Sequence, residues 1–398
     1  MRETLSIPDP LPDLSPASHG GFDLDDAVRV ERVSYGTQYG MRIPALLYLP
    51  RHPAGRIPGL LIVPGHGGDK HSWYARYAGA LYARAGAAVL TFDPVGEGER
   101  NDTHRSRSQA HDRLSPDAED GRRVTGLMVT DLLQGVSYLR RREEIDPSRI
   151  AVLGFSLGSY ATALAGAVDS RPWVAVMASG GNLDGAGGYW DSSRPMCQGF
   201  SYQALRFLGD RPAALYAMHA QRGPSLIVLG GNDTVVRAPR LGALFLGDLQ
   251  DRVAHLLEGK RGEIFSWKIV DAGGHQPFFL GREVAGWLEE EIDLPAWSVP
   301  EIAAFPQVRI GEWADRQGID LGHLGRRSDR DAGTEALPAS IPRVPSEDLD
   351  AFTPAEWQAL KTHLVLESWV ESMHAEERQL RAEGLLTHHL PPVSDSPK

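Results

Sequence analysis

Short apolar runs alternate with segments of helical periodicity between residues 28 and 292. The runs that we expect to form strands are Val28–Tyr35, Met41–Leu49, Gly59–Val63, Ala87–Phe92, Ile150–Leu153, Trp173–Ala178, Pro224–Leu229 and Ile264–Val270. The segments with helical character are His71–Ala85, Val124–Arg142, Leu157–Ala167, Pro239–Leu257 and Phe279–Ile292. This alternation predicts an α/β protein with a doubly wound, mostly parallel sheet. The first two runs predict an antiparallel hairpin at the edge of that sheet.

The same pattern divides the chain into three parts. Residues 1–57 form an N-terminal extension and the edge hairpin, residues 58–292 form the core, and residues 293–398 form a C-terminal extension that is partly helical. Residues 1–27 are rich in Pro, Asp and Ser and should be irregular. The segment of about residues 180–223 lies between two expected strands. It is too long for an ordinary connection, which predicts an inserted cap. Helical character returns from Thr353 to Glu383, behind a capping signal at Thr353 and Glu356.

Composition narrows the class of protein. The 398 residues are 42% hydrophobic and 23% charged, which is typical of a globular chain in water. The net charge is −11, and no stripe of Lys and Arg runs through the sequence, so nucleic acid is not an expected partner. No apolar run approaches the length of a membrane span and the N-terminus lacks an apolar signal region, so we expect no membrane partner. A single cysteine, Cys197, fits a reducing cytoplasm.

The strongest chemical signal is Gly154-Phe-Ser-Leu-Gly158, which stands between an expected strand and an expected helix. In a strand–turn–helix of this kind the serine occupies a strained backbone conformation, and the two glycines remove side chains that would collide with neighbouring backbone. Ser156 is therefore the candidate nucleophile. The amide of Leu157, at the start of the helix, would face the group that the serine attacks.

Two further residues follow the ends of later strands and complete a candidate catalytic triad. A serine hydroxyl needs a base to take its proton, and an imidazole needs a carboxylate to fix its tautomer. His275 is the candidate base and Asp233 the candidate acid, because both follow expected strands whose carboxyl ends meet at one rim of the sheet. The order Ser156, Asp233, His275 is that of α/β-hydrolases. Asp184 is the one rival acid that we consider.

The segment Pro64-Gly-His-Gly-Gly68 follows the first core strand and can supply the second half of an oxyanion hole. Two preorganised amides would then stabilise the negative oxygen of a tetrahedral intermediate. We assign Leu157 and Gly68 as the donors, with Gly67 as a near alternative for the second. His66 is expected to brace this loop by hydrogen bonding.

Four motifs resemble those of bacterial α/β-hydrolases of the dienelactone hydrolase and acetyl xylan esterase-like group. They are His66-Gly-Gly-Asp-Lys70, Phe92-Asp-Pro-Val-Gly-Glu-Gly-Glu-Arg100, Asp146-Pro-Ser-Arg-Ile-Ala-Val-Leu-Gly-Phe-Ser-Leu-Gly158 and Gly274-His275. The resemblance covers about residues 28–292 and implies the α/β-hydrolase fold and a serine esterase mechanism. It places Ser156, Asp233 and His275 in the nucleophile, acid and base positions. The chain has serine where dienelactone hydrolases carry cysteine, and Gly68 where acetyl xylan esterases carry an aromatic residue.

We therefore expect a serine carboxylesterase that acts on a small-molecule ester and needs no cofactor. Three alternatives remain open: a peptidase or amidase of prolyl oligopeptidase-like type, an acyltransferase, and a scaffold without catalysis. An intact triad argues against the scaffold, and residues 1–58 are too few for the propeller that would mark the peptidase.

Three further expectations concern surfaces and loops. Ligand spacing in the loop from Asn101 to Arg123 supports no metal site. Arg100 could pair with an acidic substrate, although a buried ion pair within the protein is favoured. In the C-terminal extension, the expected helix would turn four apolar side chains either toward the body of the chain or toward a second copy of it: Trp357, Leu360, Leu364 and Trp369.

Overall fold

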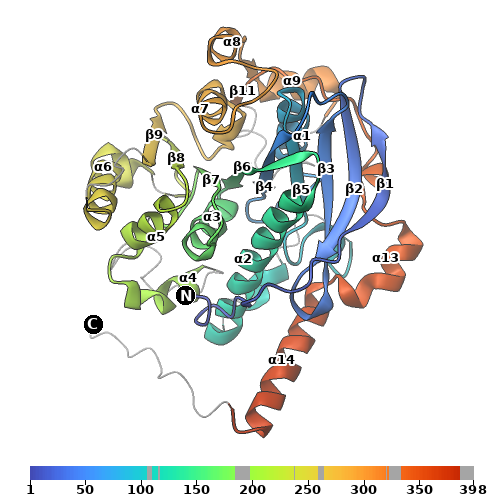
Figure 1. Cartoon of the computed structure of the whole chain (residues 1–398), viewed down its shortest axis with the longest axis vertical. Coiled ribbons are helices and arrows are strands. Elements are labelled where there is room, and N and C mark those ends of the chain that lie inside the picture. The colour runs from blue at the N-terminus through green and yellow to red at the C-terminus, as the bar shows by residue number, and fades with distance from the viewer. Residues whose placement is uncertain are drawn as a thin grey trace.

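One nine-stranded sheet runs through the molecule (Figure 1). The computed structural model describes residues 1–104, 110–114, 117–183, 198–236, 238–258, 264–319, 321 and 333–385, apart from the side chains of 238–241 and 346. The strands are β1 Ala17–Asp23, β2 Val28–Gly36, β3 Arg42–Pro50, β4 Ile57–Val63, β5 Ala88–Phe92, β6 Ile145–Phe155, β7 Val174–Ala178, β8 Ser225–Gly230 and β9 Phe265–Val270. Their spatial order is β1-β2-β3-β5-β4-β6-β7-β8-β9. Strands β4 to β9 pair in parallel, whereas β1, β2 and β3 pair antiparallel.

Helices cover both faces of the sheet. The α-helices of the described residues are α1 Trp73–Arg84, α2 Ala118–Arg141, α3 Leu157–Val168, α4 Gly199–Ala204, α5 Arg211–Ala220, α6 Ala238–Leu256, α7 Arg282–Ile292, α8 Val299–Ala304, α9 Ile310–Gln317, α12 Ser346–Leu349, α13 Pro354–Leu360 and α14 Leu366–Ala382. Side chains alternate along β4: Leu61 packs in the cluster formed with α2, α3, α5 and α6, whereas Leu60 and Ile62 pack with α1 and α7. The predicted doubly wound α/β fold is confirmed.

The first strand was not expected. Residues 1–27 were predicted to be irregular, but Ala17–Asp23 form β1 and pair with β2, with Phe22 opposite Val30. The sequence pattern did not indicate this strand. Because β1 lies at the edge of the sheet, its residues are mostly exposed or half-buried and show no apolar alternation. The predicted hairpin of β2 and β3 is present, one position in from the edge.

The segment after Asp293 also holds more structure than its polar composition indicated. Helices α8 and α9 and a short pair of strands, β10 Val308–Arg309 and β11 Glu335–Ala336, occupy it. Ile302, Ile310 and Trp313 are buried in the same cluster as α1 and α7. The buried residues of α9, Ile310, Trp313 and Ala314, do have helical spacing, but α8 and α9 have only six and eight residues, so the pattern was too short to indicate helices.

The helical prediction for Thr353–Glu383 holds in part. The Thr353 hydroxyl and the Glu356 carboxylate form a capping box, which starts α13. The helix is interrupted by a 3-10 turn at Lys361–His363 before α14 begins. Trp369 of α14 is buried and donates its indole N–H to Gln38 Oε1 at 3.2 Å, so α14 packs on the same chain near the β2–β3 turn.

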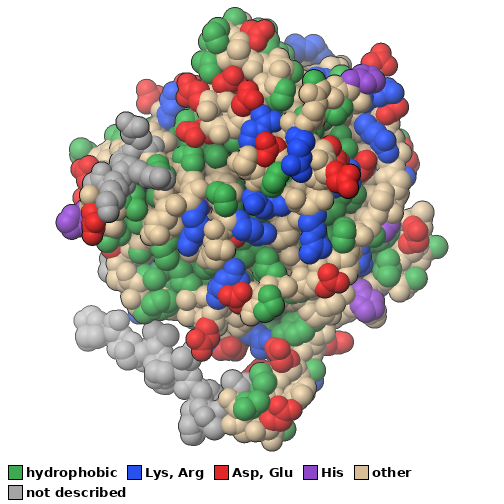
Figure 2. Space-filling view, in the orientation of Figure 1, with side chains coloured by type: hydrophobic (Ala, Val, Ile, Leu, Met, Phe, Trp, Pro, Cys, Tyr) green, Lys and Arg blue, Asp and Glu red, His purple; other side chains and the backbone are tan. Residues whose placement is uncertain are grey.

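Much of the expected cap, including Asp184, Tyr189, Trp190 and Cys197, lies outside the described residues. Its later part forms α4 and α5, where Tyr202 is fully buried. The visible face carries acidic and basic side chains intermingled among apolar ones (Figure 2). Among the helices described, none combines the length and apolar character that crossing a bilayer requires.

Candidate active site

Ser156 stands at the corner where β6 ends and α3 begins. Its φ of 54° and ψ of −113° are strained for a residue with a side chain. A Cβ atom on Gly154 would lie 2.6 Å from the Gly158 carbonyl carbon, and one on Gly158 would lie 2.1 Å from the Val63 carbonyl oxygen. Both positions therefore require glycine, for the reason that the sequence pattern indicated. The Ser156 amide donates to the Ala178 carbonyl at 2.9 Å, which ties the corner to β7.

The structure brings Ser156, Asp233 and His275 together. His275 Nε2 lies 2.9 Å from Ser156 Oγ, and His275 Nδ1 lies 2.8 Å from Asp233 Oδ2. Asp233 follows β8 and is fully buried, while His275 follows β9 with 11% of its side chain exposed. The imidazole thus bridges a hydroxyl and a buried carboxylate, the geometry that a serine nucleophile with a general base requires.

Local turn chemistry fixes the Asp233 carboxylate. Its Oδ1 accepts the amides of Val235 and Val236 at 2.8 and 3.2 Å, which leaves Oδ2 directed at the imidazole. A Cβ atom on Gly230 would lie 2.2 Å from the Gly274 carbonyl oxygen, so the ends of β8 and β9 approach each other closely. This close approach brings the Asp233 and His275 loops into contact.

Ser179 supports the histidine loop and was not identified from the sequence. It is fully buried after β7, with a φ of 50°. Its hydroxyl donates to the Gln276 carbonyl at 2.9 Å and accepts the Gln276 amide at 3.0 Å. This pair of bonds anchors the residue next to His275. Its position just beyond a parallel strand is the signal that could have found it.

The loop from Pro64 to Ser72, here called the β4–α1 loop, lies against the nucleophile. A Cβ atom on Gly65 would come within 3.2 Å of Ser156 Cβ. The Gly65 amide donates to the Tyr74 hydroxyl at 2.9 Å, and the Gly68 amide donates to the Gly65 carbonyl at 2.8 Å. The Gly68 amide is thus already used by a turn. Among the described residues, the amides of His66 and Gly67 have no acceptor.

A small, mostly apolar hollow adjoins this loop and the start of α3. Its lining includes Gly67, Leu157, Ala161, Pro94 and Met128. The predicted donor Leu157 is therefore positioned at the wall of the hollow, at the N-terminus of α3, where amides point outward without helical partners.

His66 of the β4–α1 loop forms a cluster with His111 and Asp112, and His111 also lines the hollow. His66 Nε2 is 2.8 Å from Asp112 Oδ1, so the expected brace of the loop is present. Burial, together with the neighbouring His66, lowers the pKa of His111 to about 4. One ligand atom from each residue lies within 4.8 Å of the others, so these side chains could hold a divalent metal ion.

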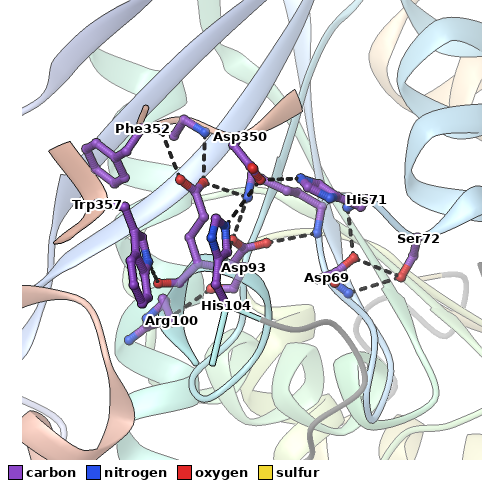
Figure 3. Close-up of polar contacts among 12 residues, drawn as sticks. Asp69, His71, Ser72, Asp93, Arg100, His104, Asp350, Phe352 and Trp357 are labelled. Carbon is purple, nitrogen blue, oxygen red and sulfur yellow. Dashed lines mark hydrogen bonds and ion pairs between the residues drawn. The ribbon is translucent and has the colours of Figure 1, made fainter. Parts of the chain in front are cut away.

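A second polar cluster lies at the far end of the β4–α1 loop (Figure 3). Lys70 Nζ is 2.6 Å from Asp93 Oδ2 and 2.8 Å from Glu99 Oε2, and all three side chains are fully buried. Burial alone would lower the pKa of Lys70, but the two carboxylates raise it above its ordinary value. Glu99, His104 and Asp350 also meet the spacing of metal ligands, but the Lys70 ammonium already neutralises Glu99.

Arg100, which could have met an acidic substrate, forms a buried ion pair instead. Its Nη1 lies 2.5 Å from Asp131 Oδ2, and each side chain is 1% exposed. The guanidinium is therefore enclosed by the protein, as the favoured interpretation expected.

Two solved structures of similar fold have esterase names. The methylesterase BT1017 is 20% identical, with a TM-score of 0.56, and the match covers 96% of this chain and 73% of that one. The Bacteroides fragilis protein BF1801, described as a candidate acetyl xylan esterase, is 17% identical with a TM-score of 0.51, over 68% of this chain and 72% of that one. These likenesses confirm the α/β-hydrolase fold.

Among curated proteins, this chain is similar to fungal hydrolases. The hydrolase ffsE of Aspergillus flavipes is 36% identical over 158 residues, which is 37% of this chain and 32% of that protein. The hydrolyase poxO of Penicillium oxalicum is 32% identical over 189 residues, which is 48% of this chain and 38% of that protein. The matches span well under two thirds of these relatives' length.

The family itself follows from a longer match. Residues 73–290, more than half of the chain, match the model of the prolyl oligopeptidase family. That range contains Ser156, Asp233 and His275, and the esterase-like neighbours share the same fold. The chain is thus an α/β-hydrolase and belongs to the prolyl oligopeptidase family.

Proposed function

We propose that this hydrolase cleaves a carboxylic ester through Ser156, His275 and Asp233. The observation that carries the proposal is the bridging imidazole, with 2.9 Å from Nε2 to the Ser156 hydroxyl and 2.8 Å from Nδ1 to the Asp233 carboxylate. An Nδ1–H donated to Asp233 leaves Nε2 as a free base that can accept the serine proton.

In the proposed reaction, Ser156 Oγ attacks the ester carbonyl as its proton passes to His275 Nε2. Asp233 stabilises the imidazolium, which then protonates the departing alcohol. Water, activated by the same imidazole, attacks the acyl-serine and releases the acid.

The Leu157 amide would hold the oxyanion together with an amide of the β4–α1 loop. The sequence assigned the second donor to Gly68, with Gly67 as the alternative. Because the Gly68 amide already donates to the Gly65 carbonyl, we take the Gly67 amide as the second donor.

Two observations favour an ester over a peptide bond. The neighbours of similar fold are a methylesterase and a candidate acetyl xylan esterase. The hollow beside Leu157 and Gly67 is small and mostly apolar, although Glu97, His111 and Asp131 also line it, and we take it as the place of a short acyl group. Membership of the prolyl oligopeptidase family keeps a peptidase or amidase as the second candidate.

The test compares wild type with Ser156→Ala on p-nitrophenyl esters from acetate to octanoate and on acyl-peptide p-nitroanilides. We expect a burst of p-nitrophenol in wild type, fastest with the shortest acyl groups, and none in the variant. Faster turnover of the anilides would favour the peptidase. Ester products formed with an added alcohol would reveal acyl transfer. Equal activity of both proteins would refute the triad.

A further inference from the structure

The beginning of the C-terminal helical segment contacts the end of the β4–α1 loop (Figure 3). We propose that residues 350–361, here called the docking segment, position this loop for catalysis, with Glu99 as a positioning residue that acts through Lys70. The inference rests on the proposed function, because that function gives the β4–α1 loop its task beside Ser156.

Glu99 is held by the docking segment. It lies in the turn after β5 and is fully buried. Its two carboxylate oxygens accept the backbone amides of Ala351 and Phe352 at 2.7 and 2.9 Å, and its carbonyl accepts the Trp357 indole N–H at 2.8 Å. A buried carboxylate is stable only if donors satisfy its oxygens. Two of the donors to Glu99 are amides of the docking segment.

Glu99 in turn holds the loop. Lys70 Nζ lies 2.8 Å from Glu99 Oε2 and 2.6 Å from Asp93 Oδ2, and the Lys70 amide donates to Asp93 Oδ1 at 3.2 Å. Lys70 stands two positions after Gly68. Because the Gly68 amide donates to the Gly65 carbonyl, and Gly65 lies against Ser156, we expect a shift of the buried ammonium to be passed along the loop to the nucleophile.

Asp350 gives the docking segment a second contact with the loop. Its Oδ1 lies 3.3 Å from His71 Nε2 and 3.5 Å from His104 Nε2. The His71 amide donates to Asp69 Oδ1 at 2.9 Å, which forms the turn leading into α1. The His104 ring stacks on Trp357, with the ring centroids 5.0 Å apart and the planes 10° apart, so His104 has two contacts with the docking segment.

These contacts connect the docking segment to the β4–α1 loop, although the two are far apart in the sequence. The position of this loop determines where its proposed oxyanion donor lies relative to Ser156. Displacing a catalytic group by about 1 Å can cost up to about a hundredfold in rate. The docking segment therefore acts on activity through the position of the β4–α1 loop rather than by contact with substrate.

The experiment compares Glu99→Gln with Glu376→Gln in the full-length chain. Glu376 also joins the C-terminal extension to the core, since its Oε2 lies 2.6 Å from Arg123 Nη2, but it contacts α2 and Tyr39 rather than the β4–α1 loop. Glu376→Gln thus removes one carboxylate contact of the same extension at a half-exposed position away from the loop, whereas Asp350→Asn and Glu99→Gln act at the loop. Two quantities are measured at a temperature where both variants are folded: amide hydrogen exchange of residues 65–72, and the rate at which a fluorophosphonate labels Ser156.

In Glu99→Gln we expect faster exchange in residues 65–72 and labelling slower by about tenfold to a hundredfold. Glu376→Gln should leave both unchanged. Exchange and labelling at wild-type rates in Glu99→Gln would overturn the inference. If that variant does not fold, Asp350→Asn decides in the same way, with a smaller change in each quantity.

Failure of the proposed function gives a different result. A wild-type protein that the fluorophosphonate does not label would contradict the role of Ser156, whereas the exchange of residues 65–72 still tests whether Glu99 positions the loop.

Discussion

The buried pair of Arg100 and Asp131 predicts a large and specific loss of stability on substitution. Asp131 Oδ2 lies 2.5 Å from Arg100 Nη1, its Oδ1 accepts the Thr37 hydroxyl at 2.7 Å, and the two charged side chains are each 1% exposed. Asp131→Asn keeps the volume but removes the negative charge. Among the described residues, Arg100 would then have only neutral acceptors, which are the Asp93 carbonyl at 3.2 Å and the side-chain carbonyl of the introduced asparagine.

The magnitude follows from the charge left without a partner. Removing one member of a buried ion pair typically costs about 3–5 kcal/mol, because the remaining ion is neither solvated nor paired. Two unit charges about 4 Å apart interact by about 4 kcal/mol at an effective dielectric of about 20, which agrees with that range. Replacing both members, as in Arg100→Met with Asp131→Leu, removes the orphan charge and should cost much less than either single change.

The assay is urea unfolding of wild type, Asp131→Asn, Arg100→Met and the double variant, with the free energy of unfolding compared at equal m-values. We expect the single variants to lose about 3–5 kcal/mol and the double variant to recover most of it. If both single variants lose less than about 1 kcal/mol of unfolding free energy, this reasoning is refuted, because an exposed ion pair contributes no more than that.

Three other predictions follow from single contacts. Gly158→Ala would place a Cβ atom 2.1 Å from the Val63 carbonyl oxygen, so we expect a destabilised protein with little esterase activity, measured by thermal unfolding and ester hydrolysis. The hydrogen bond to Asp350 raises the pKa of His104, so this contact stabilises the fold below about pH 6.5, the ordinary pKa of histidine, and is lost as pH rises through the raised value. His104→Gln should therefore destabilise more at pH 6 than at pH 9 in denaturation experiments. Asp233→Asn should keep the fold but lower kcat by about 10⁴, as loss of the correct tautomer does in other triads; a change below tenfold would contradict the role of this carboxylate.

Most of the catalytic core could be predicted from local sequence patterns. Ser156 could be placed from its glycines, and Asp233 and His275 from the strands they follow, because the carboxyl ends of parallel strands converge at one rim. Turn geometry could not be derived in the same way. The choice of Gly67 or Gly68 as the second oxyanion donor depends on which of the two amides is already hydrogen-bonded within the turn. Here the Gly68 amide donates to the Gly65 carbonyl.

Contacts distant in the sequence could not be predicted. Glu99 meets Ala351 and Phe352 across more than 250 positions, and no periodicity or motif links the two segments. Strand β1 was missed because an exposed edge strand lacks apolar alternation, and the helix that buries Trp313 was missed because its apolar pattern covers only eight residues. The division into three parts and a role for the C-terminal extension in joining two copies stay predictions.

The most direct test of the central claim is mass spectrometry of the protein trapped with p-nitrophenyl acetate. We predict that the intact wild-type chain gains the mass of one acetyl group and that the modified peptide carries it on Ser156. Asp233→Asn should gain it far more slowly, and Ser156→Ala should not gain it. An acetyl group on another residue, or on Ser156→Ala to the same extent, would contradict the account.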